Sequence, residues 1–117
     1  MSKVLRRKAK EPQSVAMTER ELMGSLRDAA RQCGWLWYHT QVSLYSARGF
    51  PDVAMVKVNA DGTARLAIWE LKGPKGIVTE AQQVWLDALA LVPGVDVRVV
   101  RPDGLEACYK YLAGIKE

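Results

Sequence analysis

Two carboxylates and one amine occupy positions that a β-hairpin would bring together. Asp52 precedes one predicted strand, Glu70 and Lys72 end the next, and Asp61-Gly62 between the two strands predicts a tight turn. In such a hairpin the start of the first strand lies beside the end of the second. Side chains alternate across a strand, so Glu70 and Lys72 point to the same face. The hairpin therefore predicts a cluster of two acids and one ammonium.

This cluster is suited to metal-assisted hydrolysis. Two neighbouring carboxylates repel each other unless a cation lies between them, and their hard oxygen atoms suit Mg²⁺ or Mn²⁺. Mg²⁺ held by few carboxylates keeps several waters, which leaves positions for a phosphate oxygen and an attacking water. Lys72 would orient or activate that water. The alternative is an exposed strand pair, Glu70 with Lys72, and a turn residue at Asp52, because Glu-x-Lys is a common tripeptide.

An acid near the start of the first predicted helix is a further candidate. Thr18 and Glu21 have the spacing of a capping box, so a structural role is expected for Glu21. Glu19 lies on the same helical stripe as Leu22 and Leu26, which would face the sheet, and it can reach the acidic cluster. The alternative for Glu19 is a first-turn acid stabilised by the helix dipole.

Three other polar residues flank the predicted cluster. Thr79 and Gln82 repeat the capping-box spacing, so Gln82 can cap the second helix, contact substrate, or do both. Arg48 and Lys75 lie on the loops beside the cluster, where they can meet phosphates or remain solvated. Neither GxxxxGK[ST] nor GxGxxG occurs, which argues against a nucleotide cofactor.

The pattern of apolar residues predicts the elements that must position these side chains. The expected elements are a helix over 18–33, strands over 35–42, 53–58 and 65–71, a helix over 79–92, a strand over 95–100 and a helix over 105–115. The order α-β-β-β-α-β-α predicts an α/β fold with a mixed central sheet flanked by helices. The last strand should lie parallel to the one before it, through a right-handed crossover.

The charge is concentrated at the start of the chain. The 117 residues include 49% hydrophobic residues, which predicts one compact domain. The first 17 residues hold five Lys and Arg and one Glu, a difference equal to the whole net charge of +4. We therefore expect a flexible basic arm over 1–17 and a folded domain over 18–117. Nucleic acid is a natural partner for such an arm, although a solubilising tail gives the same count.

Several classes of protein are disfavoured. The apolar stretches are far shorter than the roughly 20 residues needed to cross a bilayer, and no signal-peptide pattern is present, so we expect a cytoplasmic protein without membrane contact. Cys33 and Cys108 are isolated, which argues against a zinc site or a disulfide framework. His39 has no second ligand at metal spacing, so it is expected to be packed rather than catalytic. The four tryptophans are expected in the core or on a face of the sheet; they are Trp35, Trp37, Trp69 and Trp85.

Four short motifs resemble those of a known nuclease family. They are Gly49-Phe50-Pro51-Asp52, Trp69-Glu70-Leu71-Lys72, Thr79-Glu80-Ala81-Gln82 and Trp85-Leu86. Their order is similar to that of the VRR-NUC family in the PD-(D/E)XK superfamily, over a match from Thr18 to the end of the chain. The terminal strand and Arg101-Pro102 also look like the closing elements of that family. The resemblance implies a restriction-endonuclease-like core.

The resemblance also implies roles for individual residues. Asp52 and Glu70 would bind the divalent metal, with the Leu71 carbonyl as a further ligand, and Lys72 would handle the nucleophilic water. Glu19 matches the acid of the family's first helix, a metal ligand, for which Glu21 is a second candidate. Gln82 matches the glutamine of the helix that follows the site.

The resemblance implies an enzyme that cleaves DNA of a particular structure and requires Mg²⁺ or Mn²⁺. Stand-alone members of the family look like homodimers that cut branched DNA. By this resemblance the protein is expected in the cytoplasm of a bacterial or phage-infected cell. A four-way (Holliday) junction needs two matched cuts, which a two-fold dimer places naturally. The alternatives are a nuclease for flaps or single-stranded ends, and a non-catalytic nucleic-acid-binding module.

Overall fold

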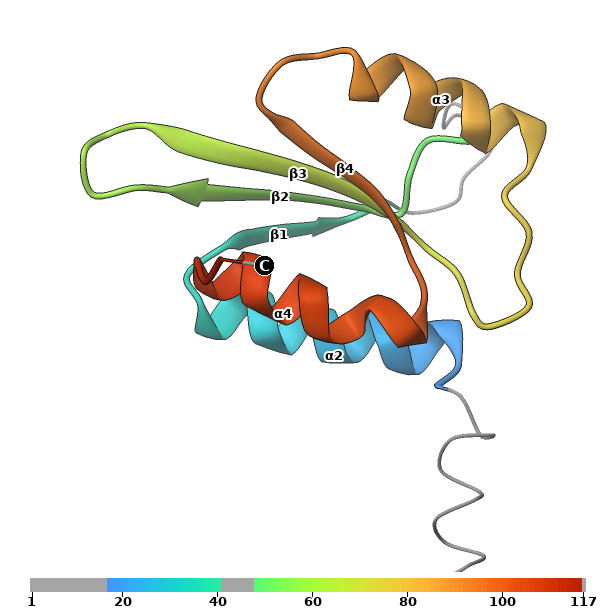
Figure 1. Cartoon of the computed structure of the whole chain (residues 1–117), viewed down its shortest axis with the longest axis horizontal. Helices are drawn as coiled ribbons and strands as arrows, with labels where there is room; N and C mark the ends of the chain where they lie inside the picture. Colours follow the sequence, from blue (N-terminus) through green and yellow to red (C-terminus); the bar gives the residue numbers. More distant parts are fainter. Residues whose placement is uncertain (1–16, 41–47, 117) are drawn as a thin grey trace, which may run out of the picture.

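The computed structural model describes residues 17–40 and 48–116 (Figure 1). Within these ranges the chain is an α/β domain with a four-stranded mixed sheet and three α-helices, as the sequence predicts. The elements are α2 (Glu19–Gln32), β1 (Leu36–His39), β2 (Val53–Val58), β3 (Ala64–Leu71), α3 (Glu80–Ala90), β4 (Val95–Val100), the 3₁₀ turn η1 (Pro102–Gly104) and α4 (Leu105–Ala113). The predicted arm falls almost entirely outside the described residues. None of the described helices has the length and apolar run that crossing a bilayer requires.

The strands lie in the order β1-β2-β3-β4. The first two pairs are antiparallel and β3 pairs with β4 in parallel, so the predicted hairpin and the predicted parallel pairing of the last strand are both confirmed. Asn59 N–H donates to Thr63 O at 2.7 Å at the hairpin turn, where Gly62 has a φ of 89°. The register pairs Val53 with Trp69, so the residues just outside this pair, Asp52 and Glu70, lie opposite each other at the open end of the hairpin.

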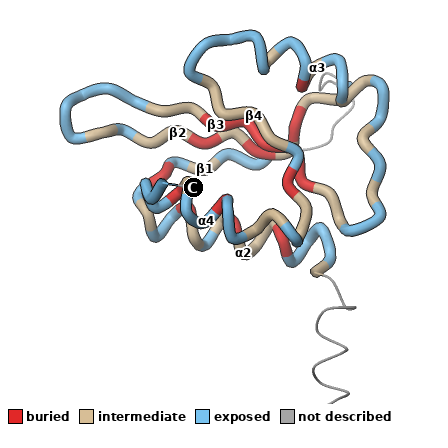
Figure 2. Tube along the Cα trace, viewed as in Figure 1, coloured by how far each residue is buried: buried red, intermediate tan, exposed pale blue. Residues whose placement is uncertain are grey.

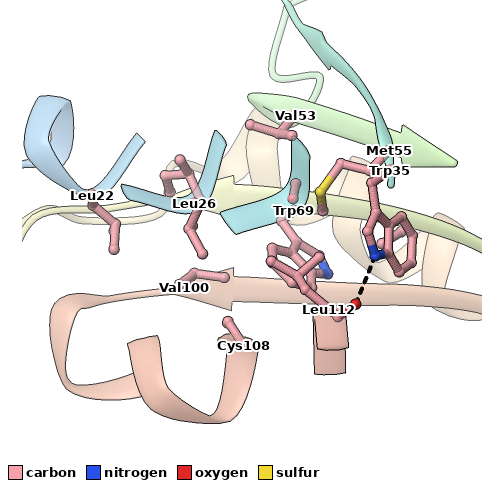
Figure 3. Packing of buried hydrophobic residues seen from close by; sticks show 12 residues of the cluster. Leu22, Leu26, Trp35, Val53, Met55, Trp69, Val100, Cys108 and Leu112 are labelled. Atoms are coloured by element: carbon pink, nitrogen blue, oxygen red, sulfur yellow. Dashed lines mark hydrogen bonds between the residues drawn. The ribbon is translucent and has the colours of Figure 1, made fainter. Parts of the chain in front are cut away.

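The hydrophobic core lies between one face of the sheet and two helices. Helices α2 and α4 pack side by side against this face, whereas α3 lies on the opposite side (Figure 1). Buried positions follow the centre of the strands and the inner faces of the helices (Figure 2). Each buried Leu or Val contributes roughly 1.5–3 kcal/mol to folding. The main contributors are Leu22, Leu26 and Ala30 of α2, Val53, Met55, Ala67, Trp69, Leu71 and Val100 of the sheet, and Cys108 and Leu112 of α4 (Figure 3).

Both predicted capping boxes are present. In α2 the Thr18 N–H donates to Glu21 Oε1 at 2.9 Å, and Glu21 N–H donates back to Thr18 Oγ1 at 3.1 Å. In α3 the Thr79 N–H donates to Gln82 Oε1 at 2.9 Å, and Gln82 N–H donates to Thr79 Oγ1 at 3.2 Å. Each box satisfies amide groups that a helix leaves unpaired at its start. The structural role predicted for Glu21 is confirmed.

Some element boundaries and one packing prediction were wrong. Strand β1 begins at Leu36 because the Trp35 indole turns into the core and donates to Leu112 O at 2.9 Å (Figure 3). Helix α4 ends at Ala113, because Gly114 takes the left-handed conformation that caps a helix. His39 is exposed rather than packed, because it lies on β1 at the edge of the sheet. The last two residues of the predicted first strand lie outside the described residues.

Candidate functional site

Asp52 and Glu70 face each other at the open end of the hairpin. The pairing of Val53 with Trp69, continued by one residue, sets Asp52 opposite Glu70. The Leu71 N–H donates to Asp52 Oδ2 at 2.7 Å, so the carboxylate replaces a carbonyl at the end of the ladder. This bond holds Asp52 against the end of β3. The structure therefore brings together the two acids that the hairpin predicts.

Glu70 is buried, and it is paired with Lys72. Its side chain is 2% exposed, and its Oε2 lies 3.4 Å from Lys72 Nζ, on a lysine side chain that is itself 12% exposed. The expected alternative of an exposed strand pair is therefore wrong. Alternation along β3 places Glu70 on the side of the sheet that carries α3, opposite the core positions Trp69 and Leu71.

The pKa of Glu70 is shifted by its surroundings. Burial raises the pKa of Glu70 to about 7; the charge of Asp52 acts in the same direction and Lys72 opposes it. The second oxygen, Oε1, is buried and has no hydrogen-bond partner among the described residues. Burying a carboxylate costs free energy unless its oxygens are paired or bind a metal. One oxygen of Glu70 is thus free for a ligand.

Glu19 lies within electrostatic range of this pair. Partial burial raises the pKa of Glu19, the charge of Asp52 raises it further, and Lys72 lowers it. A Cβ atom placed on Gly73 would lie 3.7 Å from the Glu19 nitrogen, so the loop after β3 packs against the start of α2. The carboxylate of Glu21 is held by Thr18 instead. Of the two candidate acids of the first helix, Glu19 is the one that faces the cluster.

The loop after β3 restrains Lys72. Its backbone N–H donates to Val100 O at 2.9 Å, which extends the β3–β4 ladder by one residue. Arg101 Nη1 donates to Gly73 O at 3.0 Å, and Gly76 N–H donates to the same carbonyl at 3.2 Å. A Cβ atom on Gly76 would lie 3.1 Å from Lys72 Cδ, so the loop closes over the aliphatic part of the lysine. These contacts limit where the ammonium group can point.

The residues before Asp52 are held against α3. The Phe50 and Trp85 rings meet edge to face, with centroids 5.0 Å apart, and Trp85 Nε1 donates to Arg48 O at 3.1 Å. Gly49 has a φ of 87°, and a Cβ atom there would lie 2.5 Å from the backbone of Ala81. Only glycine allows this approach. These contacts fix the segment that leads into Asp52 against α3.

Gly49→Ala is expected to destabilise the fold more than Gly62→Ala. Both glycines have a positive φ, which costs a side chain roughly 1–2 kcal/mol, but a Cβ atom on Gly62 would meet nothing within 4 Å. The added clash with Ala81 should increase the loss at Gly49 by at least about 1 kcal/mol. Urea unfolding of both variants measures the difference. An equal loss in the free energy of unfolding for both variants would show that the turn at Gly49 can move away from Ala81 without destabilising the fold.

Other predicted site residues lie further from the acids. The Gln82 side-chain carbonyl is used by the cap of α3, and the structure describes no contact between Gln82 and the Asp52–Glu70 pair. Arg48 and Lys75 are exposed, one on the turn that precedes Asp52 and the other on the loop that follows Lys72. Their exposure leaves them accessible to a large anion.

The acidic residues fit a hydrated hard cation better than a fully enclosed one. Within 17–40 and 48–116, no group of three or more His, Cys, Asp and Glu side chains converges closely enough to hold a metal ion. The pair Asp52 and Glu70 supplies carboxylate oxygens, one of them buried without a partner. Mg²⁺ is commonly bound through one or two carboxylates and keeps the rest of its shell as water. The residues present fit that mode of binding.

No family model, curated protein or solved structure matches the chain. The local chemistry at the open end of the hairpin is therefore what indicates a function.

Sequence patterns did not reveal Thr40 as a neighbour of the site. Thr40 N–H donates to Asp52 O at 2.8 Å, which continues the pairing of His39 with Val53 and sets Thr40 beside Asp52. Its Oγ1 is buried and, like Glu70 Oε1, has no hydrogen-bond partner within the described ranges. The only signal in the sequence is the alternation along the strand, which cannot fix a register across the segment 41–47.

Proposed function

We propose that this chain is a divalent-metal-dependent DNA endonuclease of the VRR-NUC family, with a PD-(D/E)XK core. The observation that carries the proposal is the buried Glu70 carboxylate, which lies between Asp52 and Lys72 with one oxygen unpartnered. Lys72 pairs with one oxygen of Glu70, and leaving the other oxygen buried without a partner is unfavourable, so that oxygen is available to a metal ion. Its neighbours are those that hydrolysis of a phosphodiester requires.

Asp52 and Glu70 would hold Mg²⁺ or Mn²⁺, with the Leu71 carbonyl as a further ligand. Glu19 does not converge with these two acids into a three-acid site, so it would act on the ion through a coordinated water. A bound ion of this type polarises a phosphoryl oxygen and lowers the pKa of a coordinated water. The bond from Leu71 N–H to Oδ2 keeps Asp52 in place and would leave Oδ1 for the ion. Glu19, at the start of α2, lies within electrostatic range of Asp52 and Lys72.

Lys72 would orient the attacking water and stabilise the charge that develops on the phosphate. The water oxygen would form a bond to phosphorus and release a proton to solvent, the P–O3′ bond would break, and the departing O3′ would take up a proton from solvent. The products would be a 5′-phosphate and a 3′-hydroxyl. The loop that closes over Lys72 keeps its ammonium group near Glu70 and limits its freedom before substrate binds.

The substrate proposed is branched DNA, with four-way junctions preferred and a homodimer as the active form. One described domain carries one such site, and a symmetric pair of sites would make two matched cuts. The basic residues at the start of the chain and the exposed Arg48 and Lys75 are suited to phosphate contacts that do not depend on sequence. The proposal includes a cytoplasmic location in a bacterial or phage-infected cell.

A panel of DNA substrates tests this function. Four-way, flap, splayed and linear substrates are incubated with Mg²⁺, Mn²⁺ or a chelator, and the cut positions are mapped. We expect cleavage only with metal, strongest on four-way junctions, together with a dimer by light scattering. A strict monomer would favour flaps or single-stranded ends. Binding that ignores metal, without any nicking, would favour a non-catalytic binding module.

A further inference from the structure

Two buried oxygen atoms lie on either side of Asp52 without a partner. They are Thr40 Oγ1 and Glu70 Oε1, the side-chain atoms with this property in the described part of the chain. Thr40 is bound to Asp52 through the β1–β2 ladder, and Glu70 lies opposite Asp52 across the β2–β3 ladder. Residues directly opposite in antiparallel strands share a face, with Cβ atoms about 4.5–5.5 Å apart. The three side chains therefore form one row across the sheet.

A hydroxyl in this position is unfavourable in the absence of a ligand. A buried donor or acceptor without a partner costs about 1–3 kcal/mol, and native proteins contain few of them. The neighbouring Asp52 carboxylate does not pair with the Thr40 hydroxyl, and its Oδ2 accepts from Leu71 N–H instead. Thr40 lies next to the proposed metal ligands, so a group bound at the metal site could supply the missing hydrogen-bond partner of its hydroxyl.

We propose that Thr40 is a further residue of the active site, whose hydroxyl bonds to an oxygen in the coordination shell of the ion held by Asp52 and Glu70. The inference rests on the proposed function. The oxygen can belong to a metal-bound water or to the substrate phosphate, since a hydroxyl accepts from the first and donates to the second. Few protein ligands leave several such oxygens around the ion.

Thr40→Val removes the hydroxyl and keeps the shape of the side chain, whereas Thr40→Ser restores the hydroxyl. In the metal-free protein Thr40→Val should keep or raise the Tm, because it deletes a group without a partner. If the partner is a metal-bound water, the Kd for Mn²⁺ alone, measured by calorimetry, should rise about three- to tenfold. If it is a phosphate oxygen, Mn²⁺ uptake stays unchanged and single-turnover cleavage slows by a similar factor. Thr40→Ser should recover most of either loss.

Thr63→Val is the matched control. Thr63 lies at the hairpin turn, at the opposite end of the hairpin from Asp52 and Glu70. Its hydroxyl donates to Asp61 Oδ1 at 2.6 Å and accepts from Asn59 Nδ2 at 2.9 Å. Thr63→Val should therefore lower the Tm and leave Mn²⁺ uptake and cleavage unchanged. A similar fall in Tm for Thr40→Val would overturn the inference. A Thr40→Val protein that takes up Mn²⁺ and cuts DNA as the wild type does would also overturn it. Failure of the proposed function looks different, because the wild type itself would then neither take up Mn²⁺ nor cut DNA.

Discussion

Lys72→Ala is expected to slow metal-dependent DNA cleavage by about 10²–10⁴-fold, the usual contribution of a positioned proton-transfer or charge-stabilising group. The Lys72 ammonium lies 3.4 Å from the buried Glu70 and is held there by the loop that follows β3. Its removal takes away the cation closest to the proposed nucleophile. Single-turnover cleavage under saturating enzyme measures the change.

Lys75→Ala is the control for lost positive charge. Lys75 is exposed on the same loop, so its loss should weaken DNA binding slightly without a large change in the rate of the bound complex. Circular dichroism and DNA affinity should show that Lys72→Ala remains folded and still binds. A Lys72→Ala protein that cuts at the wild-type rate would remove the catalytic assignment.

Asp52→Asn should have an effect of similar size for a different reason. The asparagine side chain keeps a carbonyl that can accept from Leu71 N–H, so the local fold is preserved. The charge that attracts the ion is lost. Mn²⁺ uptake should fall together with cleavage, whereas in Lys72→Ala the ion should still bind.

The second large effect concerns the stability of the metal-free protein against pH. The pKa of Glu70 is raised from 4.5 to about 7, first by burial and then by Asp52. Between these values the folded protein holds a proton that the unfolded chain releases. The contribution of Glu70 is therefore fully present below about pH 4.5 and is lost as the pH rises through 7. Its loss should lower the free energy of unfolding by about 1–3 kcal/mol.

Urea unfolding at several pH values measures this slope. Glu70→Gln should flatten it, because the amide does not titrate, whereas Glu106→Gln on the exposed side of α4 should not. Mn²⁺ should stabilise the wild type more at pH 7.5 than at pH 5, since the ion competes with the proton for the same oxygen atoms. An identical slope in the wild type and Glu70→Gln would show that Glu70 ionises normally in the fold.

The parts of the site that depend on local rules were predictable. The ladder runs to the pair Val58 and Ala64, and Asn59 N–H donates to Thr63 O beyond it, so the loop is longer than the Asp61-Gly62 pair. A turn centred near Asp61-Gly62 still brings Asp52 to Glu70, which is the part of the register that the sequence predicts. The capping boxes follow from spacing alone. Helical periodicity also placed Glu19 on the correct side of α2.

Other features arise only when distant elements meet. The burial of Glu70 depends on both faces of the end of β3 being covered, which a Glu-x-Lys tripeptide does not reveal. The approach of Gly49 to Ala81 and the place of Thr40 beside Asp52 depend on how long loops close. The entropy lost on closing a loop increases only slowly with its length, so loops of many lengths could close in this way. The spacing of these residues in the sequence therefore does not predict the contacts.

The bond from Arg101 to Gly73 ties the site to the last third of the chain. A fragment that stopped at Val100 would retain every proposed metal ligand and Lys72. It would lack the guanidinium that anchors the lysine-bearing loop and the helix that seals the hydrophobic interior. The smallest working unit of this protein must therefore extend well beyond its last strand, even though no proposed ligand lies there.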